Sequence, residues 1–435
     1  MISKRRLRIV LLALVLVSAV GVAQGWATRP PRDSAPAGDG VTAITAQGRD
    51  TIGDTGRMVA FGPDGEKLAE HSRYNTYFDV DPVEGEEMVV EFVAVDYTPE
   101  ADCPEGLPTR GNRCARQVLL RTDVRTNETT VVWETYYSKL HKMHDFDRIN
   151  ETHVVVADIW RDAVHVVNVS SGERTWSWYT NESYARDGNG SSGPEGWTHI
   201  NDVEIVRDGW IMATLRNFDR TVFIDPGEGV VRDWTIGCED CHDVLYEHHN
   251  SDYMPGNETE PPTVIIADSE NDRIVEFQRV DGDWEESWTY TNADMHWPRD
   301  ADRLPNGHTL ITDSNANRVY EIDGNDQIIW QTAIGNPYEA ERLGTGDESA
   351  NLPRESTAVV GSDGPVDGAL LTLRSAIPSK LLSGALFVLP YWAGVGELLF
   401  LVVGLLSLLA LVGLEVHRRY QVGPALSRLA RRFRR

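Results

Sequence analysis

A fifteen-residue pattern occurs four times without a gap, and this repetition constrains the fold more than any other feature of the chain. The copies are VVVADIWRDAVHVVN from Val154, IMATLRNFDRTVFID from Ile211, VIIADSENDRIVEFQ from Val264 and TLITDSNANRVYEID from Thr309. Each copy reads as a short apolar strand, a polar turn and an alternating strand. Repetition at a spacing of 45–57 residues indicates one supersecondary unit, either stacked or arranged radially.

The second copy departs from the other three at two adjacent positions. Its fifth and sixth residues are Leu215 and Arg216. The other copies have Asp158, Asp268 and Asp313 at the fifth position, and Ile159, Ser269 and Ser314 at the sixth. A residue that departs from its own repeat is a candidate for a role outside the fold, so Arg216 becomes a candidate site residue.

Strands and turns around these copies predict an all-β fold, a six-bladed β-propeller with seven blades as the alternative. Four strands per unit, with a tryptophan on the last, are typical of a propeller blade, and we expect these tryptophans to pack between blades. Five blades are predicted at about 74–137, 143–180, 197–237, 245–290 and 295–335. Residues Ile44–Ala69 supply three strands of another blade, and we expect Glu355–Gly361 to supply its innermost strand. A blade built from both ends of the chain leaves no free sheet edge.

Two apolar runs flank this region and predict transmembrane helices. The first, Leu7–Gln24, follows a basic cluster, and the second, Leu386–Leu414, is interrupted only by Glu397 and precedes another basic cluster. Spanning a bilayer takes roughly 20 apolar residues; the first run has 18 and the second has 29. Basic flanks predict cytoplasmic termini and an extracellular propeller at the cell membrane; a cleaved signal peptide is the alternative for the first run. The predicted parts are a helix in 1–27, a flexible linker in 28–43, the propeller in 44–380, a helix in 384–416 and a basic tail in 417–435.

The formal net charge is −26, with 67 acidic and 41 basic residues. So acidic a chain repels nucleic acid. We interpret the charge as an adaptation to high salt in a halophilic, archaeal source, and not as an acidic binding site. Six Asn-x-Ser/Thr sequons at predicted turns suit an exported glycoprotein; they are Asn127, Asn150, Asn168, Asn181, Asn189 and Asn257.

Four cysteines form two local pairs. Cys103 and Cys114 bracket a loop and predict a disulfide in an oxidising exterior. Cys238 and Cys241, followed by His242, match the C-x-x-C-H pattern of haem attachment, with a tight disulfide or free thiols as the other interpretations. We expect the disulfide and no cofactor.

Several histidines precede the innermost strands of successive blades and are expected to meet at one mouth of the central channel. They are His141, His144, His199, His248, His249 and His296. Such a ring could bind a metal, support hydrolysis by proton transfer, or transfer a group through a nucleophilic imidazole. No H-x-H or H-E-x-x-H occurs and no Ser or Cys nucleophile stands out. Arg216 suits group transfer, because a guanidinium can hold two oxygens of a tetrahedral anion.

Three stretches resemble the arylsulfate sulfotransferases. They are Trp197-Thr-His199-Ile-Asn201 with Thr214-Leu215-Arg216, then Leu245-Tyr-Glu-His-His249-Asn, and Trp297–Ile311, the last two in the form found in haloarchaea. The resemblance covers roughly residues 44–360 and implies an exported six-bladed propeller that moves a sulfuryl group between phenols without a nucleotide donor. A C-terminal membrane anchor departs from the ordinary member of the family.

The resemblance implies a catalytic set of His249, His199, Arg216 and His144. His249 would carry the sulfuryl group, with His248 as the competing nucleophile. Arg216 and His199 would hold its oxygens, and His144 would assist the phenolic oxygen, with His141 as its competitor. Asn201, His248, His296 and Arg299 are expected to bind substrate, and no metal is expected. The partners would be a phenolic sulfate donor and a phenol acceptor. The competing function is a non-catalytic, membrane-anchored propeller that serves as a binding or assembly module; a redox propeller is the third.

Overall fold

The structure, a computed structural model, describes residues 4–29, 34–48, 55–109, 111–138, 143–185, 197–346, 349–354 and 377–432. It divides into two compact units. One contains Met1–Pro30 and Leu389–Arg435, and the other contains Pro31–Val388.

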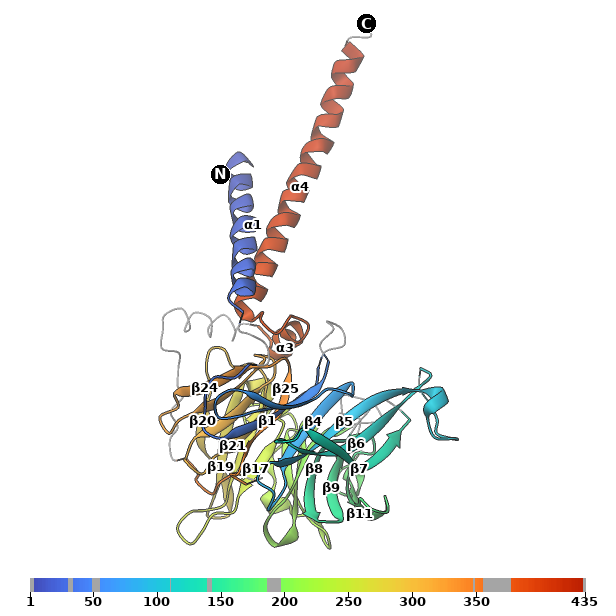
Figure 1. Cartoon of the computed structure of the whole chain (residues 1–435). Coiled ribbons are helices and arrows are strands. Elements are labelled where there is room, and N and C mark those ends of the chain that lie inside the picture. The colour runs from blue at the N-terminus through green and yellow to red at the C-terminus, as the bar shows by residue number, and fades with distance from the viewer. Residues whose placement is uncertain are drawn as a thin grey trace. The chain divides into compact units, whose positions relative to one another are not determined.

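The second unit is a six-bladed β-propeller, as predicted (Figure 1). The first blade is β4 (Thr76–Pro82), β5 (Val89–Pro99), β6 (Arg113–Asp123) and β7 (Glu128–Tyr137); the second is β8 (Met143–Asn150), β9 (His153–Asp158), β10 (Ala163–Asn168) and β11 (Arg174–Tyr179). The third is β12 (Ile200–Ile205), β13 (Ile211–Leu215), β14 (Arg220–Asp225), β15 (Gly229–Val230) and β16 (Ile236–Gly237). The fourth is β17 (Ser251–Met254), β18 (Thr263–Asp268), β19 (Arg273–Val280) and β20 (Asp283–Tyr290); the fifth is β21 (Pro298–Arg303), β22 (Thr309–Asp313), β23 (Arg318–Ile322) and β24 (Ile328–Ala333). The four copies of the sequence pattern are the second and third strands of the second to fifth blades.

The sixth blade combines strands from both ends of the propeller sequence. Its order is β25 (Pro337–Leu343), β1 (Val41–Ala46), β2 (Arg57–Phe61) and β3 (Lys67–His71). Closure by both ends was predicted, but the innermost strand is β25 and not Glu355–Gly361, which lies outside the described residues. Ile44 of β1 pairs with Ala340 of β25, so the ring of blades has no free edge at the junction.

Residues 34–40, predicted as part of a flexible linker, are instead attached to the propeller. Thr332 Oγ1 donates to the Ser34 carbonyl at 3.0 Å, and Trp330 Nε1 donates to the Pro36 carbonyl at 3.1 Å. Both donors are side-chain groups of the outermost strand β24, and the segment that accepts from them lies along this strand. The prediction was wrong here because composition does not reveal such an edge.

Six clusters of buried apolar side chains hold the blades together, one at each interface between neighbours. Trp284 of the fourth blade donates its Nε1 to the carbonyl of Trp234 in the third at 2.9 Å. Trp288 is fully buried and stacks with Arg303 of the fifth blade. Each buried large apolar side chain contributes about 1.5–3 kcal/mol. The outer-strand tryptophans are therefore packing residues.

The first unit consists of two helices, α1 (Lys4–Ala27) and α4 (Val395–Arg432). Among the described residues, Lys4–Ala27 and Val395–Arg419 are long and apolar enough to cross a membrane. Arg8 of α1 pairs with Glu415 of α4 at 3.0 Å, while Gly21 lies against Phe400. The helices are thus antiparallel, and both chain ends lie at the same end of the pair.

The second apolar run forms two helices and not the single helix predicted over 384–416. The short helix α3 (Ser379–Phe387) belongs to the propeller unit, and α4 begins at Val395. Pro390 separates the two because proline lacks a backbone donor and restricts the residue before it. Glu397 Oε2 accepts a hydrogen bond from Gly394 N at 3.0 Å and so caps the start of α4. The helix continues to Arg432, through most of the segment predicted as a tail.

Candidate functional site

Each blade contributes one tetrapeptide from the start of its innermost strand to the central channel. The six are Phe78–Asp81, His144–Asp147, Asn201–Glu204, His249–Asp252, Arg299–Asp302 and Tyr338–Glu341. The second residue bonds to the next blade: Asp79 Oδ2 accepts from Phe146 N at 2.8 Å, and Asp145 Oδ2 accepts from Val203 N at 2.7 Å. This repeated bond establishes which residues are equivalent around the ring.

The first residues of the tetrapeptides, here called the mouth ring, lie where the innermost strands begin. They are Phe78, His144, Asn201, His249, Arg299 and Tyr338. Phe78 stacks on His144 with ring centroids 4.5 Å apart, and Tyr338 lies 5.8 Å from His144. Arg299 lies 4.8 Å from the Tyr338 ring. His144 Nδ1 is 3.2 Å from Asn201 Oδ1, so the imidazole donates to the amide oxygen. The ring thus combines imidazoles, a guanidinium and aromatic faces.

The hydrogen bonds of Ser269 decide the tautomer of His249. Ser269 Oγ is 2.6 Å from the Pro298 carbonyl and 2.7 Å from His249 Nδ1. A hydroxyl has one proton, and a carbonyl can only accept, so Ser269 donates to Pro298 and accepts from His249. His249 Nδ1 therefore carries the proton, which leaves the lone pair on Nε2.

Burial, followed by the charges of Arg299 and Arg216, lowers the pKa of His249 well below its usual value of 6.5. His199 and His144 add to this effect. Transfer into a buried site disfavours the charged imidazole, and nearby cations disfavour it further. His249 is therefore neutral at physiological pH.

A second set of equivalent residues lies two positions before the mouth ring. His199, Glu247 and Trp297 occupy it in successive blades, each with positive φ (51°, 41° and 61°). His199 lies 5.5 Å from His144, and Trp297 lies 5.0 Å from His249, as ring centroids. The left-handed backbone is strained for such side chains and persists where the surroundings hold it.

Arg216 comes from the turn after β13, the 3₁₀ segment η5 (Arg216–Phe218). Its guanidinium lies 5.9 Å from the Trp297 ring centroid, and its Nη2 pairs with Glu247. Glu247 also accepts from Lys380 Nζ of α3 at 2.5 Å. The residue that breaks the sequence repeat therefore lies at the mouth, beside a carboxylate shared with α3.

The structure thus brings together His144, His199, Arg216 and His249, with Asn201 and Arg299 beside them. His248 is separate: it is fully buried, its Nε2 lies 2.9 Å from Thr221 Oγ1, and burial with the charge of Arg216 lowers its pKa to about 3. His296 is held through its backbone, which donates to Asp313 at 2.9 Å. The expectation of equivalent histidines was wrong, since only His144 and His249 occupy the same position. His141 lies outside the described residues.

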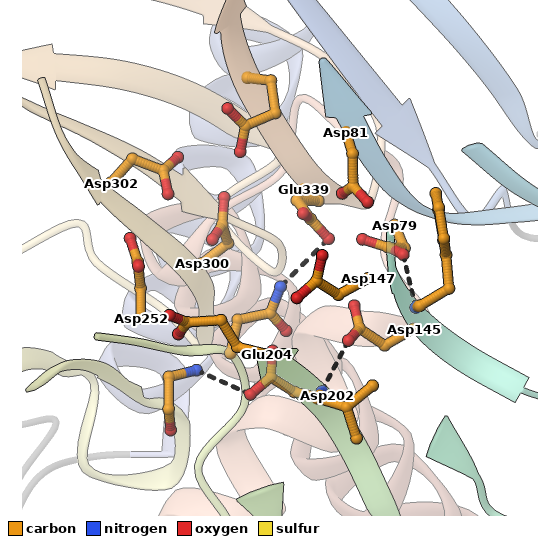
Figure 2. Close-up of a pocket in the computed structure, with 15 residues that line it drawn as sticks. Asp79, Asp81, Asp145, Asp147, Asp202, Glu204, Asp252, Asp300, Asp302 and Glu339 are labelled. Atoms are coloured by element: carbon orange, nitrogen blue, oxygen red, sulfur yellow. Dashed lines mark hydrogen bonds between the residues drawn. The ribbon is translucent and has the colours of Figure 1, made fainter. Parts of the chain in front are cut away.

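Eleven carboxylates line the channel below the mouth ring, and sequence reasoning missed them. They are the second and fourth residues of the tetrapeptides, with Asn250 as the exception, and they line one common space in the channel. Figure 2 shows the labelled side chains pointing toward this common space. Burial is the main reason why the pKa of Asp202 rises to about 7 and that of Asp300 to about 8. Part of the acidity interpreted as surface charge therefore lies inside the propeller.

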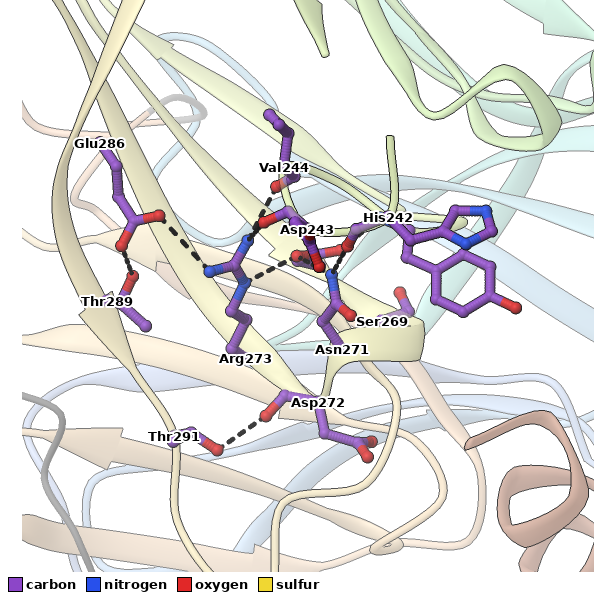
Figure 3. Close-up of polar contacts among 12 residues, drawn as sticks. His242, Asp243, Val244, Ser269, Asn271, Asp272, Arg273, Glu286, Thr289 and Thr291 are labelled. Carbon is purple, nitrogen blue, oxygen red and sulfur yellow. Dashed lines mark hydrogen bonds and ion pairs between the residues drawn. The ribbon is translucent and has the colours of Figure 1, made fainter. Parts of the chain in front are cut away.

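Both expected cysteine pairs are disulfides in the structure, Cys103–Cys114 and Cys238–Cys241. With Cys238 and Cys241 joined, no thiol remains there for haem attachment. The loop that follows is tied to the fourth blade, as Figure 3 shows: Asn271 Nδ2 donates to the His242 carbonyl at 2.8 Å, and Arg273 Nη2 donates to the Val244 carbonyl at 2.7 Å. The loop thus positions Tyr246 and Glu247 near the mouth.

Four sequon asparagines are exposed: Asn127 in a turn, Asn150 at the end of β8, Asn181 in a 3₁₀ segment and Asn257 in a loop; Asn168 is half-buried. Asn189 lies outside the described residues. The exposed positions leave room for a glycan.

No protein-family model and no curated protein matches this chain. Among solved structures, a protein of unknown function from Bacteroides caccae has a TM-score of 0.47 at 11% identity, covering 69% of this chain and 97% of its own. A periplasmic gluconolactonase from Pseudomonas aeruginosa has a TM-score of 0.45 at 10% identity, covering 70% and 99%. Virginiamycin B lyase from Staphylococcus aureus has a TM-score of 0.37 at 7% identity, covering 66% and 84%. At these values the likenesses carry no argument about activity.

Proposed function

We propose that the chain transfers a sulfuryl group from an aryl sulfate to a phenol through a sulfo-histidine at His249. The observation that carries the proposal is the bond between Ser269 and His249, which directs the lone pair to Nε2. A nucleophilic histidine must be neutral, and the lowered pKa of His249 meets this requirement.

Two guanidiniums supply the positive charge that an anionic donor needs. Arg299 and Arg216 both act electrostatically on His249, Arg299 more strongly. As negative charge gathers on the sulfuryl oxygens in the transition state, these cations and His199 stabilise it. Arg299 thus joins Arg216 in the role that sequence reasoning gave to Arg216 and His199.

The aromatic rings beside the mouth suit an aryl group. Phe78, Tyr338 and Trp297 surround His144 and His249 at centroid distances of 4.5–5.8 Å. Stacked or edge contacts with such rings favour a planar aromatic substrate. This arrangement supports phenols, and not aliphatic alcohols, as the substrate class.

In the first step, the lone pair of His249 Nε2 attacks sulfur, and the bond between sulfur and the aryl oxygen breaks. The aryl oxygen takes a proton from Nε2 of protonated His144, whose Nδ1 is held by Asn201. In the second step, neutral His144 takes the proton of an acceptor phenol, whose oxygen attacks sulfur. The N–S bond breaks, and both histidines return to their starting forms.

The test is to incubate the full chain with a chromogenic aryl sulfate and search its histidine peptides for an added SO₃ by mass spectrometry. We expect the adduct on His249 and its loss when a phenol is added. A His249→Gln variant should lose both adduct and turnover, while His153→Gln, which changes a half-buried histidine at the start of β9 outside the candidate site, should keep both. No adduct and no acceptor-dependent release of the chromophore would favour the non-catalytic binding module.

We also propose that the propeller faces the outside of the cell and both termini the cytoplasm. The antiparallel pairing of α1 and α4 puts both ends at one end of the pair, and basic residues flank both helices. Protease added to intact cells should cut the propeller and spare tags on both termini. Cleavage of either tag would reverse this topology.

A further inference from the structure

The channel carboxylates include a group arranged as cation ligands. Asp79 and Asp81 from β4 and Glu339 from β25 each offer one oxygen, and these oxygens lie within 4.8 Å of one another. Ca²⁺ binds oxygens at about 2.3–2.6 Å, so two ligands of one ion lie up to about 5.2 Å apart. The three oxygens can therefore share one ion.

Two further buried oxygens in the channel have no hydrogen-bond partner among the described residues. They are Asn250 Oδ1 and Asp302 Oδ2, on side chains that are more than nine-tenths buried. Asn250 Nδ2 donates to Glu339 Oε2 at 3.1 Å, so its amide adjoins the ligand group. Buried polar atoms are almost always satisfied. Oxygens without donors, facing the same space, are acceptors for a cation.

Nothing among the residues that line this space supplies positive charge. The lining consists of carboxylates, one amide, one hydroxyl and two apolar residues. Like charges this close disfavour one another strongly in a buried site. Oxygen-only surroundings are those that Ca²⁺ prefers, whereas Mg²⁺ gives up its waters reluctantly.

We propose that the central channel binds a Ca²⁺ ion, with Asp79, Asp81 and Glu339 as ligands. The ion joins the first blade to the sixth blade, here called the closing blade because it contains strands from both ends of the propeller sequence. It is a structural ion and takes no part in the proposed sulfuryl transfer.

The experiment uses the full chain in detergent at a constant sodium chloride concentration. A chelator first removes bound metal, and CaCl₂ or MgCl₂ is then added. Calorimetry and metal analysis after dialysis measure binding, and thermal unfolding measures its consequence. We expect binding of Ca²⁺ with a dissociation constant of about 10⁻³ M or tighter. At about 100-fold excess over that constant, the Tm should rise by about 5 °C.

The test variant is Asp79→Asn with Glu339→Gln. It should bind Ca²⁺ at least about tenfold more weakly, yet unfold in chelator at the same or a higher temperature, since it removes repulsion. The control is Asp240→Asn, in a second acidic group with Asp219 and His242 that is largely exposed. This control should bind like the wild type.

Absence of Ca²⁺ binding by the wild type would overturn the proposal, as would equal binding by the double variant. A stability gain with Mg²⁺ equal to that with Ca²⁺ would overturn the choice of ion.

Discussion

Ser269 Oγ lies 2.7 Å from His249 Nδ1 and donates its own proton to the Pro298 carbonyl. The serine thereby acts as an acceptor that fixes one tautomer of the imidazole. It occupies the sixth position of the sequence repeat, and the equivalent Ser314 donates to the Pro337 carbonyl in the next blade, with no hydrogen bond from its side chain to a histidine among the described residues. The same repeat position is thus structural in one blade and also a positioning group in another.

Replacing Ser269 with Ala should lower kcat about tenfold to a hundredfold, because His249 loses the acceptor that fixes its tautomer. KM should change little, since the cations are untouched. Steady-state kinetics measure the split between kcat and KM. Ser314→Ala is the matched control and should keep kcat; an equal loss in both variants would show a merely structural effect.

Arg216→Ala and Arg299→Ala should each slow turnover about a hundredfold or more. One cation at an anionic transition state typically lowers the activation free energy by about 3–4 kcal/mol. Single-turnover rates with an aryl sulfate measure the effect. Arg125→Ala, which changes an exposed arginine, serves as the control. Near-normal rates for either site variant would remove that residue from the catalytic set.

The acid limb of the pH profile of kcat/KM should lie below pH 6.5. In the proposed mechanism His249 reacts in its neutral form, and its lowered pKa keeps it neutral at pH values where an ordinary histidine is protonated. Activity is therefore present above this pKa and lost as the pH falls through it. Arg299→Gln removes the strongest neighbouring charge and should move the limb to higher pH. An unchanged limb would indicate a different nucleophile.

Glu247→Gln should lower KM for the aryl sulfate about threefold to tenfold, because it removes the carboxylate that pairs with both Arg216 and Lys380. A single ion pair at a partly exposed site is worth about 0–1 kcal/mol or slightly more. Glu286→Gln, which changes the partner of Arg273, is the control. A higher KM in Glu247→Gln would mean that the carboxylate positions Arg216.

Ile44→Ala should lower the free energy of unfolding by about 2–5 kcal/mol, because it opens a cavity in the fully buried core of the closing blade. Urea unfolding followed by tryptophan fluorescence measures the change, and a single transition is expected. Ile328→Ala, at a side chain 41% exposed, should change stability far less. Equal losses would show that closure does not depend on this core.

The blades were predictable because their second and third strands repeat with clear alternation and turn residues. The innermost strand of the sixth blade was not. Tyr338-Glu-Ala-Glu341 alternates acidic residues like an exposed strand, and periodicity cannot distinguish a channel wall from a surface. The same tetrapeptide pattern occurs in Phe78–Asp81 and Arg299–Asp302, so a search for it would have found both the closing strand and the channel.

The residues of the candidate site were predictable by type more than by position. Arg216 was a candidate because it breaks the repeat. His249 was a candidate because the residues around it resemble the arylsulfate sulfotransferases. His199 lies two positions before the mouth ring, at the position that Glu247 and Trp297 occupy in the next blades. Sequence alignment grouped histidines from these two different positions as one set. The role of Ser269 depends on the hydrogen bond that its hydroxyl donates to the Pro298 carbonyl in the next blade. No local sequence pattern reveals this bond.

Val41 and Leu343 face each other as the outermost pair of β1 and β25, so the chain enters and leaves the ring at one seam. A domain held this way is tethered twice. A protease that cuts the chain on one side of the propeller would leave its other connection to the helical unit intact, so separating the two units would require two cuts.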